Sequence, residues 1–112
     1  MASENNTKII IYVSSSALET QRIIHKLVED LYCANLSVFV NPVKNVVRTQ
    51  SCNIQFISDV NTLSRIKTEI DIIFGANRKI VAEFDNYTDR KAALKFKGSI
   101  LDYILEVEFR RT

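Results

Sequence analysis

With 112 residues, of which 46% are hydrophobic and 25% are charged, the chain has the length and composition of one globular domain and not of a disordered segment. The formal net charge of +2 is too small to indicate nucleic-acid or membrane binding by itself, and no run of about 18 apolar residues predicts a membrane-spanning helix. We predict a flexible tail over residues 1–7 and a single α/β-type domain over residues 8–112. The tail lacks the apolar stretch of a secretory signal, and the chain has only two cysteines, so we expect an intracellular, cytoplasmic protein.

The first two elements are predicted from local patterns. Lys8–Val13 is almost entirely apolar and β-branched, which is typical of a central strand that is buried on both faces. Ser16 and Glu19 form a capping-box pattern, after which apolar residues recur at helical spacing over Ala17–Ala34. Asn35 can adopt the left-handed conformation that ends a helix.

The middle of the chain predicts strands and a connection between them. Leu36–Val43 is expected to form a strand that ends at Pro42 or lies at a sheet edge, because proline cannot donate to a ladder. Residues 44–52 are polar and are expected to form the connection to the next strand, with Val46 and Val47 continuing one arm of a hairpin. The next strand is predicted over Asn53–Ser58.

A second helix is predicted from Asp59, which can act as its N-cap, to Phe74, with Gly75 as its stop. The alternative is a shorter helix followed by a strand over residues 70–74; the continuous helix is favoured because its spacing is kept over three turns. The side chains expected in the core on the two helices are Leu27, Leu31, Leu63, Ile66, Ile70 and Ile73.

The last third predicts a strand over Lys79–Phe84 and a short helix over Asp89–Lys97 that ends at Gly98. The final segment fits two patterns. Leu105, Val107 and Phe109 alternate with acids as in a strand, whereas residues 100–105 also fit a helix. A last strand over about Ile104–Arg110 is favoured.

This element order predicts an α+β fold with a ferredoxin-like split βαβ (βαββαβ) core, an extra C-terminal helix and a further strand. Such a core is a mostly antiparallel sheet with two helices on one face. If residues 70–74 form a strand, the alternative is a small α/β doubly wound sheet.

Catalytic and cofactor motifs are missing from the sequence. The only glycines, Gly75 and Gly98, are too far apart for a phosphate-cradling loop. His25 is the only histidine, and Cys33 and Cys52 do not form a Cys-x-x-Cys pair, so we expect no catalytic residues, no metal site and no cofactor.

Three candidate sites remain. The run Ser14, Ser15 and Ser16 precedes a helix, where backbone amides and the helix dipole favour an anion. A nucleic-acid site is suggested by basic residues near the C-terminus, namely Lys91, Lys95, Arg110 and Arg111. An interface on an open sheet face is suggested by Tyr12, Val38 and Val81.

Residues 79–109 resemble the second half of an RNA-recognition motif, with a strand ending in Phe84, a helix with Ala92 and Ala93, and a strand ending at Phe109. Aromatic stacking positions of that family fall at Ile80 and Ala82 here, so the resemblance implies a shared supersecondary pattern.

We therefore predict a non-enzymatic binding or assembly module that presents a sheet face or edge to a protein partner, possibly itself as a homo-oligomer, with no membrane. The alternative is a nucleic-acid-binding domain that uses the basic C-terminal half, and the third hypothesis is an enzyme with an unrecognised carboxylate site.

Overall fold

The structure, a computed structural model, describes residues 7–59, 62, 70–75 and 98–110. These residues form an α+β fold whose elements, in chain order, are β1 (Lys8–Val13), α1 (Ala17–Cys33), β2 (Phe39–Asn41), β3 (Val46–Arg48), β4 (Cys52–Ile57), β5 (Ile72–Gly75) and α4 (Ile100–Arg110). Neither helix is both long enough and apolar enough to cross a membrane, within the part of the chain that is described. The predicted strand 79–84 and helix 89–97, and the predicted tail apart from Thr7, lie outside the described residues.

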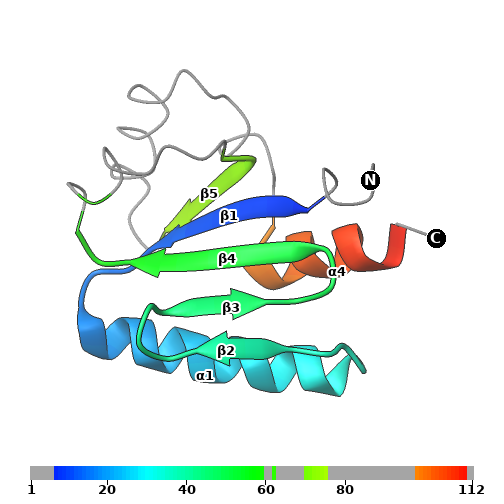
Figure 1. Cartoon of the computed structure of the whole chain (residues 1–112), viewed down its shortest axis with the longest axis horizontal. Coiled ribbons are helices and arrows are strands. Elements are labelled where there is room, and N and C mark those ends of the chain that lie inside the picture. The colour runs from blue at the N-terminus through cyan, green and yellow to red at the C-terminus, as the bar shows by residue number, and fades with distance from the viewer. Residues whose placement is uncertain (1–6, 60–61, 63–69, 76–97, 111–112) are drawn as a thin grey trace.

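The five strands form one mixed sheet in the order β2-β3-β4-β1-β5 (Figure 1). β1 lies near the centre and pairs in parallel with both β4 and β5. β2 and β3 form an antiparallel hairpin that extends the sheet beyond β4. Ile10 and Ile11 point to opposite faces of β1 and are both fully buried, which agrees with the apolar sequence of this strand.

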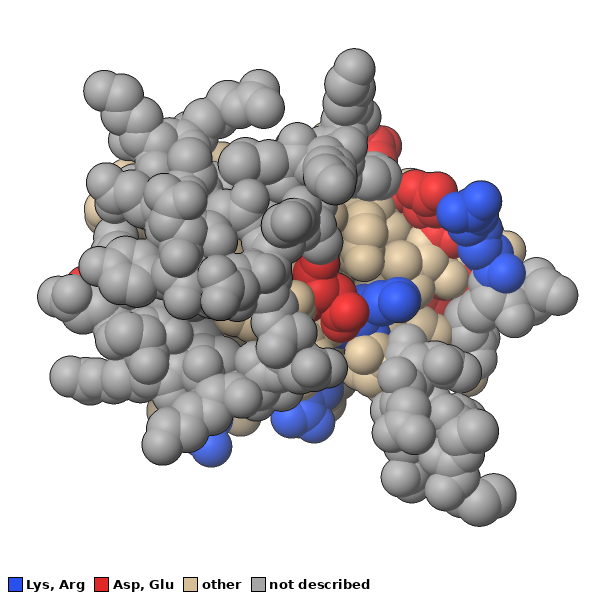
Figure 2. Space-filling model, turned by 90° about the horizontal axis from the view of Figure 1, so that it is seen from above, with Lys and Arg blue, Asp and Glu red and all other residues tan. Residues whose placement is uncertain are grey.

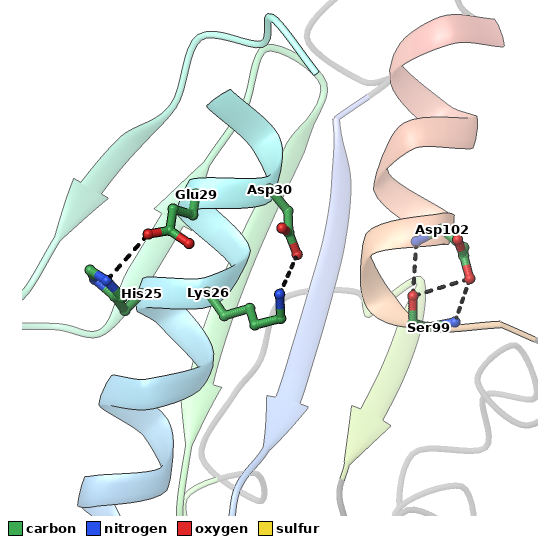
Figure 3. Close-up of polar contacts among 6 residues, drawn as sticks. All are labelled: His25, Lys26, Glu29, Asp30, Ser99 and Asp102. Carbon is green, nitrogen blue, oxygen red and sulfur yellow. Dashed lines mark hydrogen bonds and ion pairs between the residues drawn. The ribbon is translucent and has the colours of Figure 1, made fainter. Parts of the chain in front are cut away.

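Both helices cover the same face of the sheet, as the opposite views of Figures 1 and 3 show. The register identifies the side chains on that face. Tyr12 is aligned with Phe56 on one side and with Phe74 on the other, and the ring of Phe74 packs against that of Tyr103 on α4, 6.0 Å between centroids. Side chains one position out of phase with these, such as Ile11 and Gln55, point to the opposite face.

Most of the core lies between the sheet and the two helices, and Ile11 and Ile73 are buried on the opposite face of the central strands. Its largest fully buried side chains come from the central strands and both helices, and they are Phe56, Ile10, Ile11, Leu31, Ile54, Ile104, Val47 and Cys52. The predicted burial of Leu27, Leu31, Ile70 and Ile73 is confirmed, whereas Leu63 and Ile66 lie outside the described residues.

The prediction of a continuous helix through Phe74 is wrong, because Ile72–Gly75 is the strand β5. The backbone N–H of Asp71 donates to Ile9 O (2.9 Å), and the Asp71 carboxylate accepts from the N–H of Ile9 (2.8 Å). These two bonds align the segment with β1, and Ile72 and Ile73 are both buried. Pairing with the central strand β1 therefore decides the structure of this segment, although Leu63, Ile66, Ile70 and Ile73 recur at helical spacing.

The prediction of a last strand is also wrong, because Ile100–Arg110 is the helix α4. Ser99 and Asp102 form a capping box in which the N–H of Asp102 donates to Ser99 Oγ (3.2 Å) and the N–H of Ser99 donates to Asp102 Oδ2 (3.0 Å) (Figure 3). The buried stripe of this helix is Ile100, Ile104 and Glu108, at intervals of four residues. The final strand implied by the resemblance to an RNA-recognition motif is therefore absent here.

The strand order also differs from the ferredoxin-like arrangement. The predicted core has no strand at residues 72–75, whereas β5 forms there, at the edge of the sheet, and runs parallel to β1. The order β4-β1-β5 is that of a doubly wound sheet, but the antiparallel hairpin makes the whole sheet mixed. One feature of the prediction is confirmed, the α+β class. The second described helix is α4, in a segment predicted to form a strand.

Candidate functional site

The edge strand β2 is positioned by the end of α1. Asn35 has φ of 63°, and the N–H groups of Asn35 and Leu36 donate to Tyr32 O (2.9 Å) and Leu31 O (3.1 Å). This is a Schellman ending, which satisfies the last carbonyls of the helix and turns the chain back. It confirms the prediction for Asn35 and leads directly into β2.

A fixed turn connects β2 to β3. Asn41 Oδ1 accepts from the N–H groups of Val43 and Lys44, both at 3.1 Å, and Asn45 has φ of 55°. Gln55 Nε2 donates to Lys44 O at 2.8 Å. Because these bonds define the turn, Val43, which is 89% exposed, is presented at a fixed place.

Exposed apolar side chains occur on β2 and on the segments that precede and follow it in the sequence. Tyr32 at the end of α1 is 57% exposed, and Phe39 on β2 is 59% exposed. Val43 lies in the turn that follows β2, which is the terminal strand of the sheet and has no strand on its outer side in the described part of the chain. We call Tyr32, Phe39, Val43 and the outer side of β2 the β2 edge.

Of the predicted interface residues, Tyr12 and Val38 are described, and both are half-buried. Tyr12 is half-buried on the helix-covered face, with its ring 5.5 Å from that of Phe56. Burial raises the pKa of Tyr12, and the nearby Glu19 carboxylate adds to this effect. Val38 is also half-buried and packs against the core, while Val81 lies outside the described residues.

The serine run lies at the carboxyl end of β1, where α1 begins. The buried Ser14 hydroxyl hydrogen-bonds with Thr20 Oγ1 and donates to Ile57 O at 3.2 Å. Ser16 Oγ accepts from the N–H of Glu19 (3.1 Å), as the capping prediction requires. The Glu19 carboxylate accepts from the N–H of Ser15 at 2.5 Å, so an external anion would compete with Glu19 at this helix end.

Of the predicted nucleic-acid residues, only Arg110 is described, and it forms an ion pair with Glu106 at 2.9 Å. Lys91, Lys95 and Arg111 lie outside the described residues. Figure 2 shows acidic and basic side chains next to one another on the face that it displays, so the coloured residues there do not form a surface of one sign.

Other polar side chains of α1 make local contacts on its exposed face. His25 lies 3.7 Å from Glu29 and Lys26 lies 3.7 Å from Asp30, in both cases one helical turn away (Figure 3). These are solvated helix pairs, which contribute little to stability.

Sequence reasoning missed a buried polar cluster at the amino end of β4. Glu108, only 5% exposed, accepts through Oε2 from Thr49 Oγ1 (2.5 Å) and from the N–H of Ser51 (2.7 Å). Thr49 Oγ1 in turn accepts from the N–H of Cys52 at 3.1 Å. The helical stripe Ile100–Ile104–Glu108 is the signal that could have placed this acid against the sheet.

Burial raises the pKa of the Cys52 thiol in this cluster and of the Tyr103 phenol on α4. Burial is the main cause that raises the pKa of Cys52 to about 12, and that of Tyr103 to about 12. A thiol that stays protonated at neutral pH is a weak nucleophile. No group of three or more His, Cys, Asp or Glu side chains that could hold a metal ion occurs among the described residues.

Comparisons with protein-family models, with curated proteins and with solved structures found no significant match to this chain.

Proposed function

We propose that the protein is a non-enzymatic binding module that pairs the outer side of β2 with a strand of a protein partner, the simplest partner being a second copy. The observation that carries the proposal is that the terminal strand β2 and the segments next to it in sequence carry exposed apolar side chains. Of the five large hydrophobic side chains that are exposed among the described residues, three belong to the β2 edge. Apolar side chains that gather at one place on a surface mark an interaction site more strongly than scattered ones.

The chemistry of a sheet edge specifies the kind of partner. The outer N–H and C=O groups of a terminal strand are satisfied best by another extended segment, which adds to the sheet. β2 is only three residues long and is followed by Pro42, two features that limit indiscriminate pairing. Most of the affinity would therefore come from Tyr32 and Val43, which flank the strand, because apolar anchors dominate interface energies.

The setting of such an interaction is a reducing compartment. Cys33, which is exposed, and Cys52, which is buried, are both free. Free thiols of this kind support an intracellular, cytoplasmic location.

The proposal is tested by light scattering and analytical ultracentrifugation over micromolar concentrations. The wild-type chain should form dimers or larger oligomers. The double variant Tyr32→Ser/Val43→Ser should be a monomer, and Leu18→Ser should associate like the wild type, because Leu18 is equally exposed (59%) but lies at the opposite end of α1. A wild-type particle of 12.8 kDa at every concentration would contradict self-association.

A further inference from the structure

The face of the sheet opposite the helices carries an aromatic and a basic side chain in one register row. Phe39 on β2 is aligned with Arg48 on β3, and Arg48 is aligned with Asn53 on β4. Aligned residues of neighbouring strands point to the same face, so the three side chains lie next to one another. The row is out of phase with Val47 and Ile54, which face the helices, and it therefore lies on the open face.

Two of the three side chains are exposed. Phe39 and Arg48 are exposed and Asn53 is half-buried. No helix lies in front of β2, β3 and β4 in the described part of the chain (Figure 1). Arg48 forms no ion pair with any described residue, so its guanidinium is available to a ligand.

The charged side chains of the hairpin and β4 are of one sign, and the acid that contacts the turn between β3 and β4, Glu108, is buried. No Asp or Glu occurs anywhere between Asp30 and Asp59, whereas Lys44 and Arg48 lie in that interval. The hairpin and β4 therefore carry cations without acids, although the chain as a whole has 13 acids. An anionic ligand is the electrostatic complement of this surface.

We propose that the row Phe39–Arg48–Asn53 binds single-stranded nucleic acid, a function distinct from the protein binding proposed for the β2 edge, with which the row shares Phe39 alone. An unpaired base stacks on the Phe39 ring, the neighbouring phosphate accepts from the Arg48 guanidinium, and the Asn53 amide lies where it can reach a base edge. The row spans three strands, about 10 Å, which suits one stacked base and the adjacent phosphate.

Two alternatives fit the surface less well. A duplex keeps its bases stacked inside and offers none to Phe39. An acidic peptide would pair with Arg48 and Lys44 but would gain little from the aromatic ring. The combination of an exposed ring and an unpaired cation therefore favours a single strand.

The test is fluorescence anisotropy with a labelled oligouridine of about 12 nucleotides at about 50 mM salt, where phosphate contacts are strongest. Phe39→Ala and Arg48→Gln should each weaken binding about fivefold or more, and Phe39→Trp should retain it. Arg48→Gln should also reduce the slope of log affinity against log salt by about 1. The matched control is Lys26→Gln, which removes another exposed cation, on α1 behind the sheet, and should change affinity less than about twofold.

Several outcomes would overturn the proposal. These are no binding of the oligouridine by the wild-type chain, equal affinities of wild type and Phe39→Ala, and equally tight binding of a duplex or of polyglutamate. Since Phe39 and Arg48 are exposed, the variants should keep the wild-type circular dichroism spectrum, and Phe39→Trp separates loss of stacking from loss of fold. The variant Tyr32→Ser/Val43→Ser should bind the oligouridine like the wild type, so failure of one function is distinguishable from failure of the other.

Discussion

The Glu108 carboxylate on α4 accepts a hydrogen bond from the backbone N–H of Ser51 at 2.7 Å, across 57 positions of sequence. The same oxygen accepts from the Thr49 hydroxyl. One buried side chain thus satisfies two donors of the turn between β3 and β4 and ties the C-terminal helix to the sheet. This explains how a charged residue can occupy the buried stripe of a helix.

The first prediction concerns this contact. Glu108→Ala should lower the free energy of unfolding by about 1–3 kcal/mol, because it leaves the Thr49 hydroxyl and the Ser51 N–H without their buried acceptor. Urea denaturation followed by circular dichroism measures the change. Glu106→Ala, which removes an exposed pair with Arg110 on the same helix, is the control and should change stability by about 0.5 kcal/mol or less. Equal effects of the two substitutions would show that Glu108 is not an anchor.

The second prediction concerns the core. Leu31→Ala should destabilise the fold by about 2–5 kcal/mol, because Leu31 is fully buried between α1 and the sheet. Leu18→Ala on the same helix removes the same atoms from an exposed position and should change stability by about 0.5 kcal/mol or less. Thermal or urea unfolding of the two variants compares them directly, and a small effect at Leu31 would contradict the packing described for α1.

Local signals made the first helix predictable from the sequence. Ser16, Glu19 and Asn35 lie close in sequence to the groups that they cap, and the helix observed, Ala17–Cys33, ends one residue from the predicted boundary. The hairpin could also be predicted from the sequence, since Pro42 can end a strand and Val46–Val47 continue the next one. The β5 and α4 segments were not, because each fits two periodicities and contacts with distant residues decide between them.

The candidate site shows the same limit. Alternation along Leu36–Val43 cannot reveal which face the helices cover, since Phe39 and Val40 are both apolar. Phe39 is exposed, whereas Val40 is half-buried against the core, and only the strand register separates them. The partners of Glu108 lie in a distant turn, so its burial could not be read from its neighbours in sequence.

The third prediction concerns thiol reactivity. Cys33 is exposed and Cys52 is buried, with burial as the main cause of a pKa of about 12 for the Cys52 thiol. At pH 8, labelling of the native protein with Ellman's reagent should modify one thiol rapidly, and the second only after unfolding, because the thiolate is the reacting species. Cys33→Ser should abolish the rapid phase. A rapid phase that persists in Cys33→Ser would contradict the burial of Cys52.

The last prediction concerns stability at alkaline pH. The pKa of Cys52 rises from 9.0 to about 12 on folding and that of Tyr103 from 10.0 to about 12, in both cases mainly because burial disfavours the charged form. Between the unfolded and folded pKa values the unfolded chain therefore binds fewer protons than the folded protein, and stability must fall as pH rises. The contribution is fully present below pH 9 and is lost progressively up to about pH 12. Urea midpoints measured over this range should decline, and Tyr103→Phe should decline less steeply above pH 10, because it removes the Tyr103 hydroxyl that titrates there. A pH profile of Tyr103→Phe parallel to that of the wild type would mean that the hydroxyl titrates alike in both states and is not buried as the structure describes.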